Sequence, residues 1–307
     1  MKRVFTFNRY RYAMANTAEG QQRVLILGGK DGLLGQALAE ACSNTGYEIH
    51  TTGRGDIDFS GSQDISNLLE RIRPCLLFNA VAYTQVDQAE DDQEAAYDLN
   101  RFMPAMLGRV IKERPECLLV HYSTDFVFDG RKREPYTVED APAPLSVYGK
   151  SKLAGEQALL QLGLENLCII RTAWLFGPRK KNFVRTILGL CETRNSINVV
   201  DDQFGSPTYV PDLAANSLKL VHSGGRGIFH ITNSGRASWA ELASEALRLT
   251  QRECVVHPVP TREYPTKAVR PAYSVLDLSR FTECTGITPR PWPQALADYI
   301  FSEFPTE

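Results

Sequence analysis

The sequence lacks several features that would assign it to a specialised class of protein. None of its seven cysteines stands in a CxxC pair, so the spacing indicates neither a zinc ribbon nor a disulfide framework, and a reducing cytoplasm fits best. No apolar run approaches the ~20 residues of a membrane span. The net charge of −2 gives no basic field for a nucleic acid, and the five histidines show no metal-ligand spacing. We therefore expect a globular protein with no metal, no nucleic acid and no membrane among its partners.

The first 22 residues differ from the rest of the chain. They mix basic and aromatic side chains, and they lack the continuous apolar stretch of a secretory signal. Basic terminal segments are commonly solvated, so we expect residues 1–22 to form a flexible extension.

Short apolar runs then alternate with segments of helical periodicity. The predicted strands are 23–27, 47–52, 75–80, 117–123 and 167–171, and the predicted helices are 33–44, 65–72, 94–113 and 147–162. Strands that are apolar throughout indicate a parallel sheet covered on both faces, and right-handed crossovers make it a doubly wound α/β fold of the Rossmann type.

This alternation predicts the division of the chain into two parts. We expect an NAD(P)-binding Rossmann domain at 23–176, with 205–232 returning to it. Prolines become frequent after residue 176. They predict a smaller, partly discontinuous substrate-binding lobe of loops and helices, made of 177–204 and 233–307.

A glycine-rich turn follows the first predicted strand. Gly29, Gly32 and Gly35 form GxxGxxG between a strand and a helix. Glycine lets the chain turn sharply, lets the backbone approach a pyrophosphate, and lets the helix pack closely on the strand. The amino terminus of the helix offers unpaired N–H groups to the phosphates. The turn therefore predicts a dinucleotide site.

The second predicted strand ends without a carboxylate. An Asp or Glu there usually binds the ribose of NAD, whereas Arg54 offers forked donors to the 2′-phosphate of NADP. NADPH is therefore the expected cofactor, with NADH left open. Asp58 and Phe59 follow and are expected to bracket the adenine edge.

Three residues form a candidate reaction centre. Thr124 lies at the carboxyl end of the fourth predicted strand, where ligands of parallel sheets bind. Tyr148 and Lys152 are four residues apart on a predicted helix and so share one face. An ammonium one turn away favours the phenolate and moves the proton affinity of the phenol toward neutral pH. The set predicts polarisation of a ketone while a reduced nicotinamide delivers hydride to its carbon.

Together these motifs resemble the extended short-chain dehydrogenase/reductase superfamily and, within it, the dTDP-4-dehydrorhamnose reductase family. The likeness runs from about residue 23 to the end, and its most specific segments are 79–84, 121–128, 171–174 and 202–208. The resemblance implies NAD(P)H-dependent reduction of the 4-keto group of a dTDP-4-dehydro-6-deoxy sugar to give dTDP-L-rhamnose. It also implies that Tyr148 donates the proton and that Lys152 modulates it and contacts the ribose.

The candidate site residues follow from the motifs and the resemblance together. The substrate contacts are Thr124, Asp125, Phe126 and Trp174. The cofactor contacts are Gly29, Gly32, Leu33, Leu34, Gly35, Arg54, Asp58, Phe59, Ala80, Ala82, Tyr83, Tyr122, Tyr148 and Lys152.

Some positions depart from the family pattern. Gly28 stands where Thr is frequent, Tyr83 where His is common, and Phe126 where Tyr is usual, so a related nucleotide sugar stays open as the substrate. Some family members pair through a magnesium held by carboxylates, but position 37 is Ala here, so a metal-bridged dimer is not expected. The oligomeric state, including a homodimer, stays open.

Other functions also remain open at this point. A nucleotide-sugar epimerase would share the fold and the Tyr/Lys pair, while a dehydratase would need an acid pair where Asp125 is followed by Phe126. A non-catalytic NADP-binding subunit, similar to the regulatory β subunit of methionine adenosyltransferase, is the alternative from a different class. Trp174 has a plain alternative as a core residue, because large aromatic side chains are often buried at strand ends.

Overall fold

The centre of the molecule is one parallel sheet. The structure, a computed structural model, describes residues 21–304 apart from 58 and 60, so most of the predicted extension lies outside the described residues. The sheet has six strands in the order β10-β5-β4-β3-β1-β2, and all neighbours are parallel. The strands are β1 (Arg23–Leu27), β2 (Glu48–Thr51), β3 (Leu76–Asn79), β4 (Leu118–Thr124), β5 (Leu167–Thr172) and β10 (Gly227–His230).

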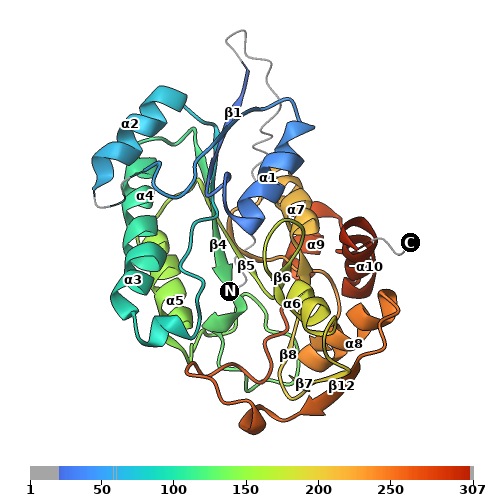
Figure 1. Cartoon of the computed structure of the whole chain (residues 1–307). Coiled ribbons are helices and arrows are strands. Elements are labelled where there is room, and N and C mark those ends of the chain that lie inside the picture. The colour runs from blue at the N-terminus through green and yellow to red at the C-terminus, as the bar shows by residue number, and fades with distance from the viewer. Residues whose placement is uncertain (1–20, 58, 60, 305–307) are drawn as a thin grey trace.

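Helices cover both faces of this sheet (Figure 1). One layer contains α1 (Leu33–Ser43), α7 (Val210–His222) and α9 (Ser279–Thr285), and the other contains α2 (Ser62–Ile72), α4 (Met103–Lys112) and α5 (Val147–Leu160). Alternate strand residues enter the two cores, as Val24 and Leu25 do. Because both faces of the central strands β1, β3, β4 and β5 are buried, these strands are largely apolar, whereas the edge strand β2 is only half-buried and carries polar residues. The prediction of a doubly wound parallel sheet is confirmed.

The long helix predicted at 94–113 is wrong in detail. The chain forms α3 (Gln93–Tyr97), then a π-helical turn η2 (Asp98–Phe102), and only then α4. Pro104 lies in the first turn of α4, where its missing N–H costs no hydrogen bond. The interruption therefore precedes the proline, and π-turns of this kind are frequent at functional sites.

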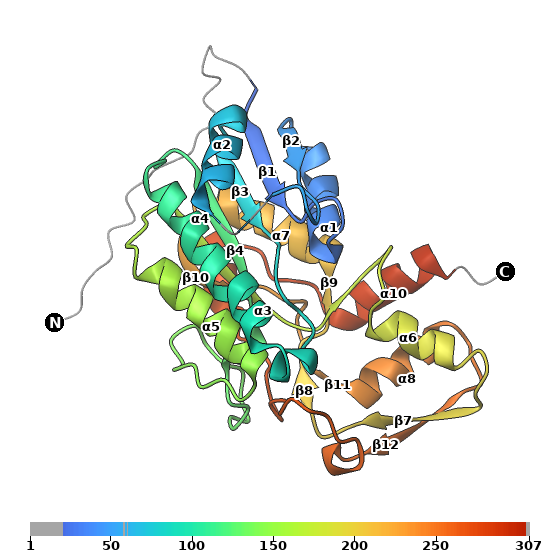
Figure 2. The ribbon, with the colours of Figure 1, turned by 60° about the vertical axis from the view of Figure 1, so that its left-hand side comes forward.

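A second, smaller core lies beside the carboxyl edge of the sheet (Figure 2). It is built from α6 (Phe183–Leu190), α8 (Trp239–Leu249) and α10 (Trp292–Glu303), together with a parallel pair of strands, β7 (Ser196–Val200) and β12 (Val255–Val259). The sequence predicted loops and helices here and missed this strand pair. No helix in the described part of the chain is long and apolar enough to cross a membrane.

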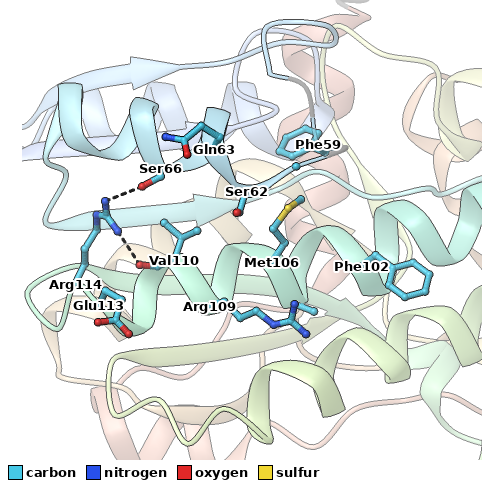
Figure 3. A pocket seen from close by; sticks show the side chains of 12 residues that line it. Phe59, Ser62, Gln63, Ser66, Phe102, Met106, Arg109, Val110, Glu113 and Arg114 are labelled. Carbon is cyan, nitrogen blue, oxygen red and sulfur yellow. Dashed lines mark hydrogen bonds between the residues drawn. The ribbon is translucent and has the colours of Figure 1, made fainter.

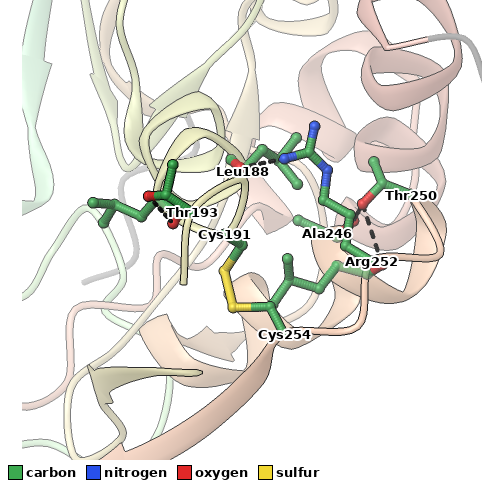
Figure 4. The surroundings of a disulfide bond; sticks show 9 residues. Leu188, Cys191, Thr193, Ala246, Thr250, Arg252 and Cys254 are labelled. Atoms are coloured by element: carbon green, nitrogen blue, oxygen red, sulfur yellow. Dashed lines mark hydrogen bonds between the residues drawn. A yellow bond between two sulfur atoms is a disulfide. The ribbon is translucent and has the colours of Figure 1, made fainter. Parts of the chain in front are cut away.

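A disulfide joins two parts of this smaller core (Figure 4). Cys191 at the end of α6 is bonded to Cys254, which precedes β12, and their Cα atoms are 5.7 Å apart. The sequence spacing indicated no disulfide framework, and the Cys191–Cys254 bond is an exception to that expectation. The two cysteines are 63 residues apart, and only the packing of α6 against α8, and of α8 against β12, brings them together.

Candidate active site

The glycine turn between β1 and α1 is closed by backbone contacts. A Cβ atom at Gly35 would lie 2.1 Å from the carbonyl oxygen of Gly28, and one at Gly32 would lie 2.7 Å from it. Gly28 itself has φ +81°, a conformation in which the Thr frequent in the family would be strained. The sequence motif explained Gly29, Gly32 and Gly35 but missed the turn residue Gly28.

The start of α1 is open to an anion. Leu33 and Leu34 form its first turn, which contains no acidic residue, and the N-cap Gly32 makes no side-chain cap. Leu34 is buried in the core and Leu33 is half-buried, so their backbone N–H groups are what this turn offers to a ligand. The N-terminal ends of helices bind phosphate through such groups.

The segment after β3 lies against this turn. The N–H of Ala80 donates to the Leu27 carbonyl at 3.1 Å, and a Cβ at Gly28 would touch Val81 and Ala80. Ala82 and Tyr83 continue this segment and are half-buried. In the sheet, β2 lies on one side of β1 and β3 lies on the other. The carboxyl ends of β1 and β3 therefore form the switch point at which open α/β sheets bind ligands.

Asn100 supports the segment after β3, although no sequence motif indicated this residue. It is fully buried in the π-helical turn η2, where its side chain accepts from the N–H of Tyr83 at 2.9 Å and donates to the Tyr83 carbonyl at 3.1 Å. It also donates to the hydroxyl of Ser151 in α5 at 3.0 Å. Asn100 therefore ties the switch-point segment to the helix that carries Tyr148. An Asn inside a predicted helix was the only available signal.

Thr124 and Asp125 are buried together at the end of β4. The Thr124 hydroxyl donates to Asp125 at 3.1 Å and accepts from the N–H of Phe126 at 3.2 Å. Ser274, a residue that the sequence did not single out, donates to the second oxygen of Asp125 at 2.5 Å. Burial raises the pKa of Asp125 to about 6, although these hydrogen bonds oppose the rise.

Tyr148 stands beside this pair at the start of α5. Its ring packs edge-on against Phe126, with ring centroids 5.6 Å apart, and its hydroxyl shares a hydrogen bond with Thr124. Burial raises the pKa of Tyr148 to about 12, and the bond with Thr124 only partly offsets it. The expectation that a nearby ammonium lowers this pKa is therefore wrong for the protein by itself. Desolvation is the largest cause of the raised pKa, and the charge of Asp125 adds to it.

Lys152 is buried one turn further along α5. Its Nζ donates to the backbone carbonyl of Tyr122 at 2.6 Å, and burial lowers the pKa of Lys152 to about 8. The side chain of Tyr122 turns away into the core, where its hydroxyl donates to Ser217 on α7 at 2.8 Å. Only the main chain of Tyr122 thus reaches the candidate site.

Trp174 lies between the end of β4 and the smaller core. It packs against the cluster that contains Val127 and Phe128, and it stacks on Trp239 of α8 with ring centroids 3.4 Å apart and an interplanar angle of 3°. Its φ of +48° is unusual for a bulky residue. Such strain is often found at ligand sites, while the stacking also accounts for Trp174 as a packed residue.

The loops at the carboxyl end of β2, residues 30–31 and 53–56, form an exposed rim that carries two carboxylates. Asp31, from the glycine turn, accepts from the N–H of Arg54 at 2.9 Å. Asp56 accepts from the N–H of Gly53 at 2.9 Å and from Lys30 at 2.7 Å. The end of β2 itself carries no carboxylate, as the sequence indicated, but Asp31 and Asp56 reach it from chain segments on either side of the strand. Arg54 is exposed above this rim.

Phe59 lines a cavity of about 620 Å³ between α2 and α4 (Figure 3). Phe102, Met106 and Arg109 of the neighbouring segment line it as well. Phe59 is half-buried at one end of this cavity. Asp58, its expected partner at the adenine edge, lies outside the described residues.

Comparison with known proteins places this geometry in a family. The model of the RmlD substrate binding domain matches residues 22–303, which is nearly the whole chain. The chain belongs to the RmlD substrate-binding family. Among the residues that the structure describes, no group of three His, Cys, Asp or Glu is arranged to hold a metal ion.

Individual members of the RmlD family are similar over most of their length. The spore coat polysaccharide biosynthesis protein SpsK of Bacillus subtilis is 38% identical over 90% of this chain and 96% of its own. The dTDP-4-dehydrorhamnose reductase of Aggregatibacter actinomycetemcomitans is 36% identical over 89% of this chain and 96% of its own. The crystal structure of dTDP-4-dehydrorhamnose reductase from Bacillus anthracis in complex with NADP is 34% identical. It superposes with a TM-score of 0.88 over 92% of this chain and 100% of its own.

Proposed function

We propose that this protein reduces the 4-keto group of a dTDP-4-dehydro-6-deoxy sugar with NADPH, in the formation of dTDP-L-rhamnose. One observation carries the proposal: Thr124, Tyr148 and Lys152 meet at the carboxyl end of β4, on the same edge of the parallel sheet as the glycine turn. The names of the RmlD relatives and the NADP bound to the Bacillus anthracis enzyme support the same reaction.

The residues at the switch point fit a dinucleotide. Three glycines whose Cβ atoms would clash with backbone or with Thr51 lead into the open first turn of α1, which suits a diphosphate. We place the diphosphate at residues 28–35, the adenine beside Phe59, the ribose phosphate at Arg54, and the nicotinamide ribose near Tyr148 and Lys152. When bound, the reduced cofactor supplies the hydride.

Tyr148 is suited to act as the proton donor. Because burial holds its pKa near 12, the phenol is protonated at neutral pH and can donate to a carbonyl oxygen as negative charge develops there. The hydroxyl of Thr124 shares a hydrogen bond with this phenol and holds it at the end of β4. Lys152 lies one helical turn after Tyr148, and its ammonium donates to the Tyr122 carbonyl. Its positive charge stabilises the phenolate that remains after proton donation.

The sugar would lie on the side of Tyr148 that faces the smaller core. We assign Asp125, Phe126 and Trp174 to its contacts, because they line the path from the end of β4 to α8. Phe126 supplies an aromatic edge without a hydroxyl, so it selects by shape and not by a hydrogen bond. We further propose a cytoplasmic location, since five of the seven cysteines are free.

The direct test offers NADPH and a panel of dTDP-4-keto sugars to the purified protein and follows cofactor oxidation by absorbance. We expect turnover with dTDP-4-dehydrorhamnose, and a product that carries a new hydroxyl at C4. A Lys150→Gln variant serves as a control, because Lys150 is exposed on the same helix. Tight NADPH binding without oxidation by any sugar would contradict the proposal and favour a non-catalytic binding subunit.

A further inference from the structure

Helix α5 carries a second buried charged residue in line with Tyr148 and Lys152. Glu156 follows Lys152 by four residues, so the three side chains stand one turn apart on one face of the helix. Lys152 and Glu156 are only 2% and 1% exposed. The proposed proton donation involves Tyr148 and Lys152 and gives Glu156 no role.

Glu156 is held in place by an arginine from the sheet. The Nε and Nη2 atoms of Arg171 donate to its two carboxylate oxygens at 2.9 and 2.7 Å. Arg171 lies on β5, is 2% exposed, and has the ring of Phe128 5.2 Å from its guanidinium. A forked pair of this kind fixes the position of the carboxylate, and its burial keeps salt from screening the charges.

Lys152 needs a counter-charge that its direct partner does not provide. Its Nζ donates to a neutral carbonyl, and no described carboxylate lies within ion-pairing distance of it. His121 on β4 is buried nearby, and its pKa is lowered by burial and by the charge of Lys152, so it stays neutral at pH 7. Asp125 and Glu90 lie near the amino-terminal end of α5, where Glu90 accepts from the N–H of Val147.

The remaining charges around α5 do not face Lys152. On α3, η2 and α4, which pack against α5, the charged side chains are exposed; these are Glu94, Asp98, Arg101, Arg109 and Lys112. Glu156 is thus the buried anion nearest to Lys152 along the helix.

We propose that Glu156, fixed by Arg171, is a positioning residue that keeps the Lys152 ammonium protonated beside Tyr148. This inference rests on the proposed reduction. Without the carboxylate, Lys152 would be buried with no anion on its face of α5, and burial would favour its neutral form. Tyr148 would then have no positive partner in the working pH range.

The sign of the expected pH effect follows directly. Burial lowers the pKa of Lys152 to about 8, and the charge of Glu156 opposes this lowering. A reaction that needs the ammonium declines as the pH rises through this pKa. Removal of the negative charge should move that decline toward lower pH, by roughly one unit or more.

The first experiment needs no substrate. The protein is labelled with ¹³C-lysine, and the resonance of Lys152, assigned by its loss in Lys152→Met, is titrated in the ligand-free chain. We expect the midpoint to be highest in the wild type, lower in Glu156→Gln with Arg171→Met, and lowest in Glu156→Gln alone. The double variant removes both charges at similar volume, so it keeps the test valid if the single variant, with its unpaired buried arginine, fails to fold.

The second experiment measures the pH profile of kcat/KM for the same variants with NADPH and the dTDP-4-keto sugar. The alkaline limb should shift in the same order, and Lys150→Gln, which removes an exposed charge from the same helix, should leave it in place. Equal Lys152 midpoints in the wild type and in the variants would overturn the inference. Absence of turnover in the wild type would instead contradict the proposed reduction, while the titration would still test the pair.

Discussion

The buried face of α5 and the exposed rim at the end of β2 handle charge in opposite ways. On α5, Lys152 and Glu156 are almost fully buried and are fixed by backbone or by a forked arginine. At the rim, Lys30 and Asp56 form an ion pair whose side chains are 54% and 40% exposed, and Arg54 is exposed beside them. Water and salt screen the rim but not the buried face. Changes on α5 should therefore alter the chemistry, whereas changes at the rim should adjust cofactor preference by small amounts.

The largest effect is expected from Tyr148→Phe. The ring keeps its packing against Phe126, and only the proton donor is lost. Positioned acid catalysis of this kind contributes about 10²–10⁴-fold, so turnover should fall by that factor while NADPH still binds. Steady-state kinetics and a cofactor-binding titration measure the two quantities. Tyr97→Phe is a matched control, because Tyr97 packs in the same small cluster; similar losses in both variants would argue against the donor role.

A second prediction concerns the stability cost of the carboxylate buried at the end of β4. Asp125 has a pKa of about 6 in the folded protein, above its unfolded value, so its contribution to stability is present at low pH and is lost as the pH rises through 6. At pH 7.5 its ionised form should destabilise the fold by ~1–3 kcal/mol. Asp125→Asn should therefore be more stable than the wild type at pH 7.5, and the gain should vanish near pH 4.

Urea unfolding at the two pH values checks this prediction. Glu165→Gln, at an exposed carboxylate in a loop, should change neither curve. A gain in Asp125→Asn that stays the same at both pH values would show that burial of the charge is not the cause.

The smallest effects are expected at the rim. Arg54→Ala should weaken NADPH binding by about tenfold, the low end for a charge-assisted hydrogen bond, because Arg54 is exposed. NADH binding should change little, and the difference should shrink as salt is raised. Equal losses for both cofactors would place Arg54 at the shared diphosphate and not at the 2′-phosphate.

Removal of a negative charge from the rim should strengthen NADPH binding. Asp56→Asn keeps an acceptor for the N–H of Gly53 but removes a negative charge and frees Lys30. An exposed pair of this kind is worth about 0.2–1 kcal/mol, so NADPH should bind roughly 1.4- to fivefold more tightly. Calorimetric titration with both cofactors measures the effect; weaker NADPH binding would show that the aspartate acts through the turn and not through its charge.

Local sequence patterns predicted the secondary-structure elements, which depend mainly on residues close together in the chain. The buried strands and the helix that carries Tyr148 lie within one or two residues of their predicted bounds, because apolar runs and helical periodicity are local signals. The π-helical turn at Asn100 escaped prediction, since its cause is the packing of that side chain against Tyr83 and Ser151.

Contacts between distant segments could not be predicted in this way. Ser274 reaches Asp125 across 149 residues, Cys254 reaches Cys191 across 63, and Asp31 reaches Arg54 across 23. Each contact is set by the fold and has no counterpart in local spacing. The proposed catalytic pair, Tyr148 and Lys152, could be found in the sequence because both residues lie on one helix, whereas the carboxylates of the rim could not.

Transfer of an isotope label tests the central claim most directly. NADPH deuterated at both C4 positions of the nicotinamide is incubated with dTDP-4-dehydrorhamnose and the protein, and the sugar product is analysed by mass spectrometry and NMR. The account predicts one deuterium at C4 of the sugar, formed rapidly by the wild type and about 10²–10⁴-fold more slowly by Tyr148→Phe. Oxidation of NADPH without deuterium at C4, or equal rates in the two proteins, would contradict it.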